Sequence, residues 1–154
     1  MKTHAVIIFL MSLVLTACDS LNRDQLLLRP SVAEQSPSED RITIAQLLSE
    51  VAESKGFKAK YLTSTVQDTV VYFEEDVEYF PIYFGARKVG DDYVVDLSHF
   101  HPGPGETEKY KQVKELIIKR LEERFGGRIK LMPKGEHIAI VHRAPPNQAP
   151  KPTQ

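Results

Sequence analysis

Two stretches of the chain repeat apolar residues at helical spacing. In the first, Thr43 and Gln46 give a capping-box pattern, with Ile42 and Leu47 spaced as a hydrophobic staple. One apolar stripe then follows, and Gly56 is the expected stop. The stripe consists of Ile44, Leu47, Leu48, Val51 and Ala52. The pattern predicts a helix from about Thr43 to Lys55.

The second helical stretch is longer, from about Thr107 to Phe125. Its expected buried stripe is Tyr110, Val113, Ile117 and Leu121, widened by Leu116 and Ile118. Gly126 and Gly127 end it, and the rigid segment His101–Gly105 precedes it. We therefore expect one face of this helix to cover the core.

Alternating and β-branched residues predict strands elsewhere in the chain. Phe57–Tyr61 alternates apolar with lysine, and Thr69–Phe73 is β-branched and aromatic. Arg128–Met132 and His137–His142 are two further short strands. The acidic run from Glu74 to Glu78 lies between strands, and it suits either a solvated turn or a patch for a cation or basic partner.

The clearest pairing is a hairpin of residues 80–89 and 92–100 around Gly90-Asp91, a strong two-residue turn signal. With Val89 facing Asp92, one face of the hairpin becomes apolar and the other mostly polar, which supports this register. The apolar face carries Ile82, Phe84, Ala86, Tyr93, Val95 and Leu97. Arg87 then lies diagonally near Asp96, as an exposed ion pair of little energetic value.

These elements predict an α+β domain in which two helices pack on one face of a mostly antiparallel sheet. The expected element order is α-β-β-β-β-α-β-β. A faint similarity at an offset of 70 residues, helix then glycine then strand, leaves open an αββ pseudo-repeat. The expected organisation is a signal peptide at 1–17, a lipidated cysteine and flexible tether at 18–40, the domain at 41–143, and a proline-rich disordered tail at 144–154. Within the tether, Leu26-Leu27-Leu28 is interpreted as a weakly ordered turn of helix, with a docking patch as the alternative.

The N-terminus has the three-part layout of a secretory signal. Lys2 and His4 precede the apolar run Ala5–Leu15, which is too short to span a membrane and is followed by small Thr16 and Ala17. Cys18 is the one cysteine of the chain, so it has no internal disulfide partner.

Leu15-Thr16-Ala17-Cys18 resembles the lipobox of bacterial lipoproteins. The resemblance covers residues 1–18 only, and the folded domain resembles no family that we identify. It implies cleavage before Cys18 and attachment of acyl chains there, which would hold the protein at a bacterial envelope membrane, facing the periplasm. Asp19 resembles the inner-membrane retention signal of enteric lipoproteins, which favours the inner membrane slightly and leaves the outer membrane open.

Charge and composition add few constraints. The chain has 20 basic and 21 acidic residues, and loss of residues 1–17 removes Lys2 and no acid, which leaves a formal charge near −2. Nucleic acid is therefore not an expected partner, since it would require a strongly basic face.

His99 and His101 are the best candidates for chemistry. Residues two apart on a strand share a face, so both imidazoles can approach one metal ion. The hairpin register places no acid and no third histidine on that face, however. We therefore expect a partly buried, hydrogen-bonded histidine pair, with metal binding as a weak alternative and no cofactor.

No other catalytic set is visible, and Ser98 faces away from His99 on the same strand. The sequence favours a non-enzymatic binding domain with an envelope protein partner: an assembly component, an inhibitor or an immunity factor. The alternative is a small metal-dependent or hydrolytic envelope enzyme using His99 and His101.

Overall fold

The computed structural model describes residues 20–30, 37–60 and 68–138. Cys18, the signal region, residues 31–36 and 61–67, and the predicted proline-rich tail lie outside these ranges. The predicted strand His137–His142 lies outside them from residue 139 on. No helix within the described ranges is both long enough and apolar enough to cross a bilayer.

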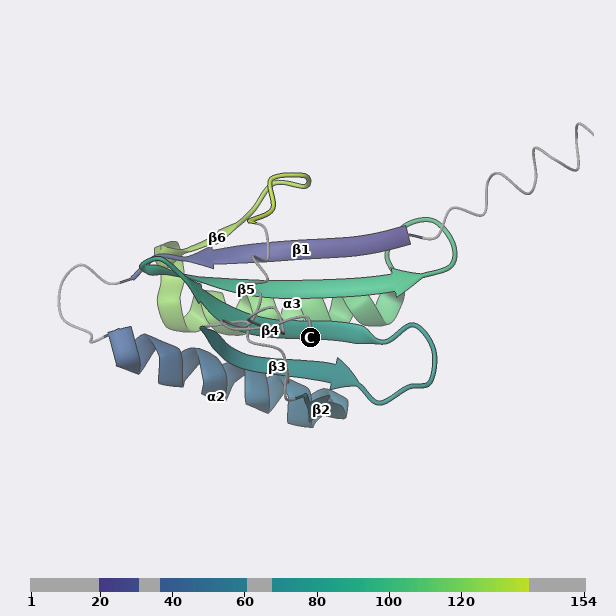
Figure 1. Cartoon of the computed structure of the whole chain (residues 1–154), viewed down its shortest axis with the longest axis horizontal. Helices are drawn as coiled ribbons and strands as arrows, with labels where there is room; N and C mark the ends of the chain where they lie inside the picture. Colours follow the sequence, from purple (N-terminus) through teal and green to yellow (C-terminus); the bar gives the residue numbers. More distant parts are fainter. Residues whose placement is uncertain (1–19, 31–36, 61–67, 139–154) are drawn as a thin grey trace, which may run out of the picture.

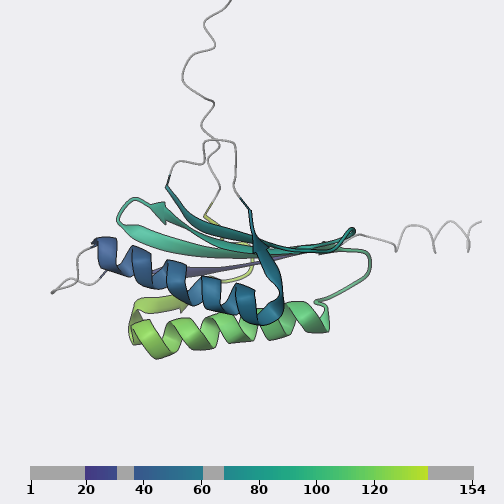
Figure 2. The same ribbon diagram turned by 90° about the horizontal axis from the view of Figure 1, so that it is seen from below.

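The described residues form one antiparallel sheet with two helices on one face. The strand order is β2-β3-β4-β5-β1-β6. In chain order the elements are β1 (Ser20–Leu28), α2 (Pro37–Lys55), β2 (Phe57–Ala59), β3 (Thr69–Glu75), β4 (Ile82–Val89), β5 (Asp92–His101), α3 (Glu108–Phe125), the 3₁₀ turn η1 (Gly126–Arg128) and β6 (Ile129–Leu131). Figure 1 shows the strands side by side, and Figure 2 shows α2 and α3 together beneath them. The predicted α+β class and the one-sided helix layer are confirmed.

The core lies between the helices and the sheet. The predicted stripe of α3 is fully buried, and Phe125 extends it by one turn. On the sheet side, the predicted apolar face of the β4–β5 hairpin is buried throughout. Ile82 pairs with His99 and Val89 with Asp92, so the predicted register is confirmed.

Strand β1 corrects the prediction of a flexible tether over residues 18–40. It pairs with β5 along nine residues, from Ser20 opposite His101 to Leu28 opposite Tyr93. Leu26 and Leu28 are fully buried in the core, so the expected turn of helix at Leu26-Leu27-Leu28 is also wrong. The domain therefore begins near residue 20 and not at 41, and the chain order is β-α-β-β-β-β-α-β.

Helix α2 begins at Pro37, six residues before the predicted start. Proline suits the first turn because its missing N–H is unneeded there, and Glu39 and Asp40 favour the same end of the helix dipole. The capping-box interpretation of Thr43 is therefore wrong. Ile42, its expected staple, is 57% exposed. The helix ends at Lys55, before Gly56 at φ +73°, as predicted.

The structure agrees with the first half of the predicted αββ pseudo-repeat and differs in the pairing of the second half. Strand β2 follows α2 and pairs with β3, as the first half of the repeat requires. Strand β6 follows α3 but pairs with β1, which precedes both halves. The strand that would complete the second half lies outside the described residues.

Candidate functional site

The outer edge of β1 is covered along only part of its length. Strand β6 pairs with Leu26–Leu28, and Met132 N–H donates to the carbonyl of Gln25 at 2.8 Å. Among the described residues, no backbone hydrogen bond reaches the outer edge over Leu21–Asp24. A pocket of about 360 Å³ lies here, between β1, the loop before α3 and the turn after β6. Its lining residues are Leu21, Asn22, Arg23, Asp24, Glu106, Lys134, Gly135 and His137.

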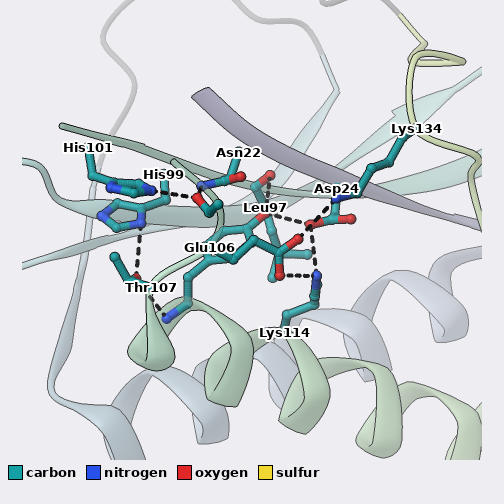
Figure 3. A network of polar contacts seen from close by, with 11 residues as sticks. Asn22, Asp24, Leu97, His99, His101, Glu106, Thr107, Lys114 and Lys134 are labelled. Carbon is teal, nitrogen blue, oxygen red and sulfur yellow. Dashed lines mark hydrogen bonds and ion pairs between the residues drawn. The ribbon is translucent and has the colours of Figure 1, made fainter. Parts of the chain in front are cut away.

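A network of two carboxylates and two lysines includes part of the inner wall of the pocket (Figure 3): Asp24, Glu106 and Lys134 line the pocket, and Lys114 joins the two carboxylates behind it. The buried carboxylate of Asp24 accepts from the Tyr110 hydroxyl at 2.9 Å and from Lys114 Nζ at 3.3 Å. Lys114 also donates to Glu106 at 2.6 Å, and Lys134 reaches the same carboxylate at 3.3 Å. The charges balance within the wall, so the network requires no bound ion for neutrality.

The pKa values of Glu106, Lys114 and Tyr110 are all shifted away from neutral pH. The hydrogen bond from Lys114 is the main cause that lowers the pKa of Glu106. Burial alone would lower the pKa of Lys114, but its hydrogen bond to Glu106 and the charge of Asp24 raise it overall. Burial, together with the adjacent Asp24 charge, raises the pKa of Tyr110. None of the three groups is therefore poised to exchange a proton near pH 7.

His99 and His101 form the predicted buried, hydrogen-bonded pair at the strand end. Their rings stack with centroids 4.8 Å apart, and both side chains are more than nine-tenths buried. His99 Nε2 donates to the Phe80 carbonyl at 3.1 Å, and Nδ1 lies 3.2 Å from Thr107 Oγ1. That oxygen also accepts from Tyr110 N–H and caps α3, so His99 supports the start of the helix.

His101 holds the segment between β5 and α3. Its Nε2 donates to the Gly105 carbonyl at 2.7 Å, and its Nδ1 lies 3.1 Å from the Pro102 carbonyl. Asn22 of β1 donates to the same Gly105 carbonyl at 2.7 Å. All four ring nitrogens of the pair therefore lie within 3.2 Å of a protein oxygen. Within residues 20–30, 37–60 and 68–138, no three His, Cys, Asp or Glu side chains are grouped to hold a metal.

The acidic run predicted as a turn or a cation patch is instead largely ion-paired. Glu74 and Glu75 belong to β3, where they bind Lys60 and Lys109. Glu75 also accepts from the Ile82 N–H, and Asp76 pairs with Lys58 at 2.5 Å. These contacts give the run a structural role and support neither a cation site nor a basic partner.

The open face of the sheet holds a second polar cluster, which the sequence predicted only in part. Arg87 and Asp96 form the predicted pair at 2.8 Å, but both side chains are largely buried and not exposed. Gln25, fully buried, donates to Ile138 O and accepts from Ile138 N, and Arg87 donates to the same carbonyl at 2.8 Å. These hydrogen bonds hold the backbone of Ile138, in the segment after β6, against the open face of the sheet. No local signal in the sequence pairs Gln25 with Ile138, which lie 113 residues apart.

His137 also lines the pocket, and the sequence pattern assigned it only to a predicted strand and to no site. It sits one residue before the Gln25–Ile138 contact, and its Nδ1 is buried with no hydrogen-bond partner among the described residues. A pocket wall with an unused acceptor or donor atom is a candidate contact for a ligand.

Comparisons with known protein families, with characterised proteins and with solved structures found no match to this chain.

Proposed function

We propose that this chain is a bacterial envelope lipoprotein whose folded domain binds a protein partner without catalysing a reaction. It is anchored through acyl chains on Cys18 and faces the periplasm. The partner is an envelope protein, and the domain serves as an assembly component, an inhibitor or an immunity factor.

The anchor rests on the residues that resemble a lipobox and on the position of β1. The strand begins at Ser20, two residues after Cys18. Two residues span at most about 7 Å, so an acylated Cys18 would hold the sheet next to the lipid head groups and not on a long tether. Stable attachment takes two or more acyl chains, because one chain alone gives only marginal binding.

The pocket beside the open edge of β1 is the observation that carries the binding function. An exposed sheet edge presents backbone N–H and C=O groups, to which an extended segment of another protein can add as a further strand. The edge at Leu21–Asp24 adjoins a concave wall, and its volume is within the range of about 300–1,000 Å³ typical of ligand sites. An extended polypeptide segment of the partner is therefore the ligand that this site suits best.

The enzymatic alternative gains no support from the geometry. His99 and His101 would have to give up contacts that hold the loop before α3 and its first turn before either ring could bind a metal or accept a substrate proton. The carboxylate of Glu75, whose charge acts on His99, is bound to Lys109, and those of Glu106 and Asp24 are bound to Lys114 and Tyr110.

Site-specific photo-crosslinking tests the binding function. A photoreactive residue in place of Lys134, at the edge of the pocket, should give one dominant crosslinked adduct with a partner protein in intact membranes. The control position is Lys119 on α3; the two lysine side chains are similarly exposed, at 78% and 72%. We expect no such adduct from position 119. Equal adducts from both positions, or none from 134, would contradict a partner at the β1 edge.

A further inference from the structure

Large apolar side chains gather at one end of the sheet. In the described part of the chain, the exposed large hydrophobic residues are Leu21, Ile42, Val77, Tyr79, Phe80, Phe100 and Leu131. Five of them lie at the end where β1 begins, and we call Leu21, Val77, Tyr79, Phe80 and Phe100 the apolar rim. The strand register establishes their placement, because Asn22 and Ile82 both pair with His99 and the rim lies beyond that rung. Figure 1 shows the β3–β4 loop and the start of β1 at this same end.

Three residues of the rim link β1, β5 and the loop before β4. Leu21 of β1 lies directly opposite Phe100 of β5, and the Phe100 ring is 6.1 Å from the ring of Phe80, just before β4. Tyr79, the neighbour of Phe80, is 70% exposed, and Leu21 is 65% exposed. A contiguous exposed apolar patch of this kind marks a docking surface in a folded protein.

The chain itself indicates what covers the rim. Cys18 lies two residues before Ser20, so its sulfur is within about 10 Å of the rim end of β1 when the strand and the thiol side chain are extended. Acyl chains on that sulfur require the bilayer surface to lie at this end of the domain. We propose that the apolar rim rests in the membrane interface, as a second, non-covalent contact with the lipid that carries the anchor. This rests on the lipid attachment in the proposed function.

The chemistry of the rim suits the interface between head groups and acyl chains. Aromatic side chains are enriched at that depth, where one end of the ring is apolar and the other meets water. Tyr79, with its hydroxyl, matches this preference best. The same loop carries the exposed carboxylate of Glu78, while its Asp76 is paired with Lys58. The charge of Glu78 would oppose docking to anionic head groups and would not oppose docking to zwitterionic ones. The rim therefore favours a zwitterionic lipid surface.

Tryptophan fluorescence tests this proposal directly, because the chain contains no tryptophan. Tyr79→Trp places a probe in the rim. Ile42→Trp is the matched control, since Ile42 is 57% exposed on α2. Its neighbours Asp40 and Arg41 bind Arg128 and Thr69, at the opposite end of the sheet. Each full-length lipidated variant is reconstituted in phosphatidylcholine vesicles with brominated acyl chains, after circular dichroism has verified its fold.

We expect a blue shift and loss of emission for Tyr79→Trp, and unchanged emission for Ile42→Trp. The loss should be smaller in vesicles of brominated phosphatidylglycerol. A rim probe that keeps its water-exposed emission in the lipidated, vesicle-bound chain overturns the proposal and assigns the rim to a protein partner, with the anchor intact. Equal quenching at both positions also overturns it, because the domain would then lie on another face.

The fatty-acid content of the purified chain shows separately whether the lipid anchor of the proposed function is correct. If the purified chain carries no fatty acid, the anchor is wrong, and the same probes are then measured with vesicles added to the unlipidated chain. Quenching of the rim probe alone would support membrane docking without an anchor. No quenching would overturn the docking proposal as well.

Discussion

Thr107 shares its hydroxyl oxygen between His99 and the backbone of the first turn of α3. Burial lowers the pKa of His99 below its usual 6.5, and the stacked His101 lowers it further, while Glu75 and the Phe80 carbonyl act in the opposite direction. Tyr110 also stacks with the His99 ring, and Asp24 is bound to that tyrosine. The neutral ring, with a proton on Nε2, therefore belongs to the folded state.

This lowered pKa predicts the sign of one pH effect on stability. The unfolded chain binds more protons at His99 than the folded chain does. The contribution of neutral His99 to the free energy of unfolding is therefore fully present above about pH 6.5, and it is lost as the pH falls through the pKa of the folded state. Between about pH 7.5 and about pH 5.5, the free energy of unfolding of the wild type should fall. In His99→Gln it should fall less over the same interval. Denaturant titration at each pH measures both, and identical slopes for the two proteins would show that His99 does not carry the effect.

At the scale of elements, β1 decides where the domain begins. It lies between β5 and β6 and supplies Leu26 and Leu28 to the core. A fragment of residues 41–143 lacks this strand, which exposes the edge of β5 and removes one of the two acceptors of the Tyr110 hydroxyl. We expect that fragment to lose cooperative unfolding, because net stability is only about 5–15 kcal/mol. Residues 19–143 should keep a single sigmoidal transition by circular dichroism.

Two point variants in the full chain serve as controls for this prediction. Leu26→Ala leaves a cavity at a fully buried position and should cost about 2–5 kcal/mol. Leu21→Ala, on the same strand but 65% exposed, should change stability by no more than about 0.5 kcal/mol. A cooperative transition in fragment 41–143, or equal costs at the two leucines, would mean that β1 is not part of the stable core.

The sequence predicted those parts of the fold that depend on residues close together in the chain, and it missed those that depend on residues far apart. The β4–β5 register follows from Gly90-Asp91 and from alternation on both sides, which are local features. Strand β1 was not predicted from the sequence because two of its helix-facing positions, Asn22 and Asp24, are polar. That polar pattern is typical of a tether. The partners of these two residues are more than eighty residues away, at Gly105 and Tyr110. The same holds for the pocket, which exists because the chain after β6 returns to Gln25.

On the scale of the whole molecule, the proposed anchor directly precedes β1, and the open edge and Leu21 of the apolar rim lie on that strand. An acylated Cys18 would place the pocket beside the membrane, since Leu21 lines the pocket and also belongs to the rim. A partner segment added to this edge would therefore run close to the lipid surface. This arrangement favours a partner that is itself attached to, or embedded in, the same membrane.

The anchor can be tested without reference to either docking site. Wild type should incorporate labelled fatty acid and partition into detergent, whereas Cys18→Ser should do neither, because the acceptor thiol is gone. The variant should remain as an uncut precursor held by Ala5–Leu15, or be cut elsewhere and become soluble. Its unfolding transition should match that of the wild type, since Cys18 precedes the first strand, which begins at Ser20. Membrane fractionation should place wild type in the inner membrane if Asp19 acts as a retention signal. Unlabelled wild type in the soluble periplasm would show that Cys18 is a free thiol and that the lipobox interpretation is wrong.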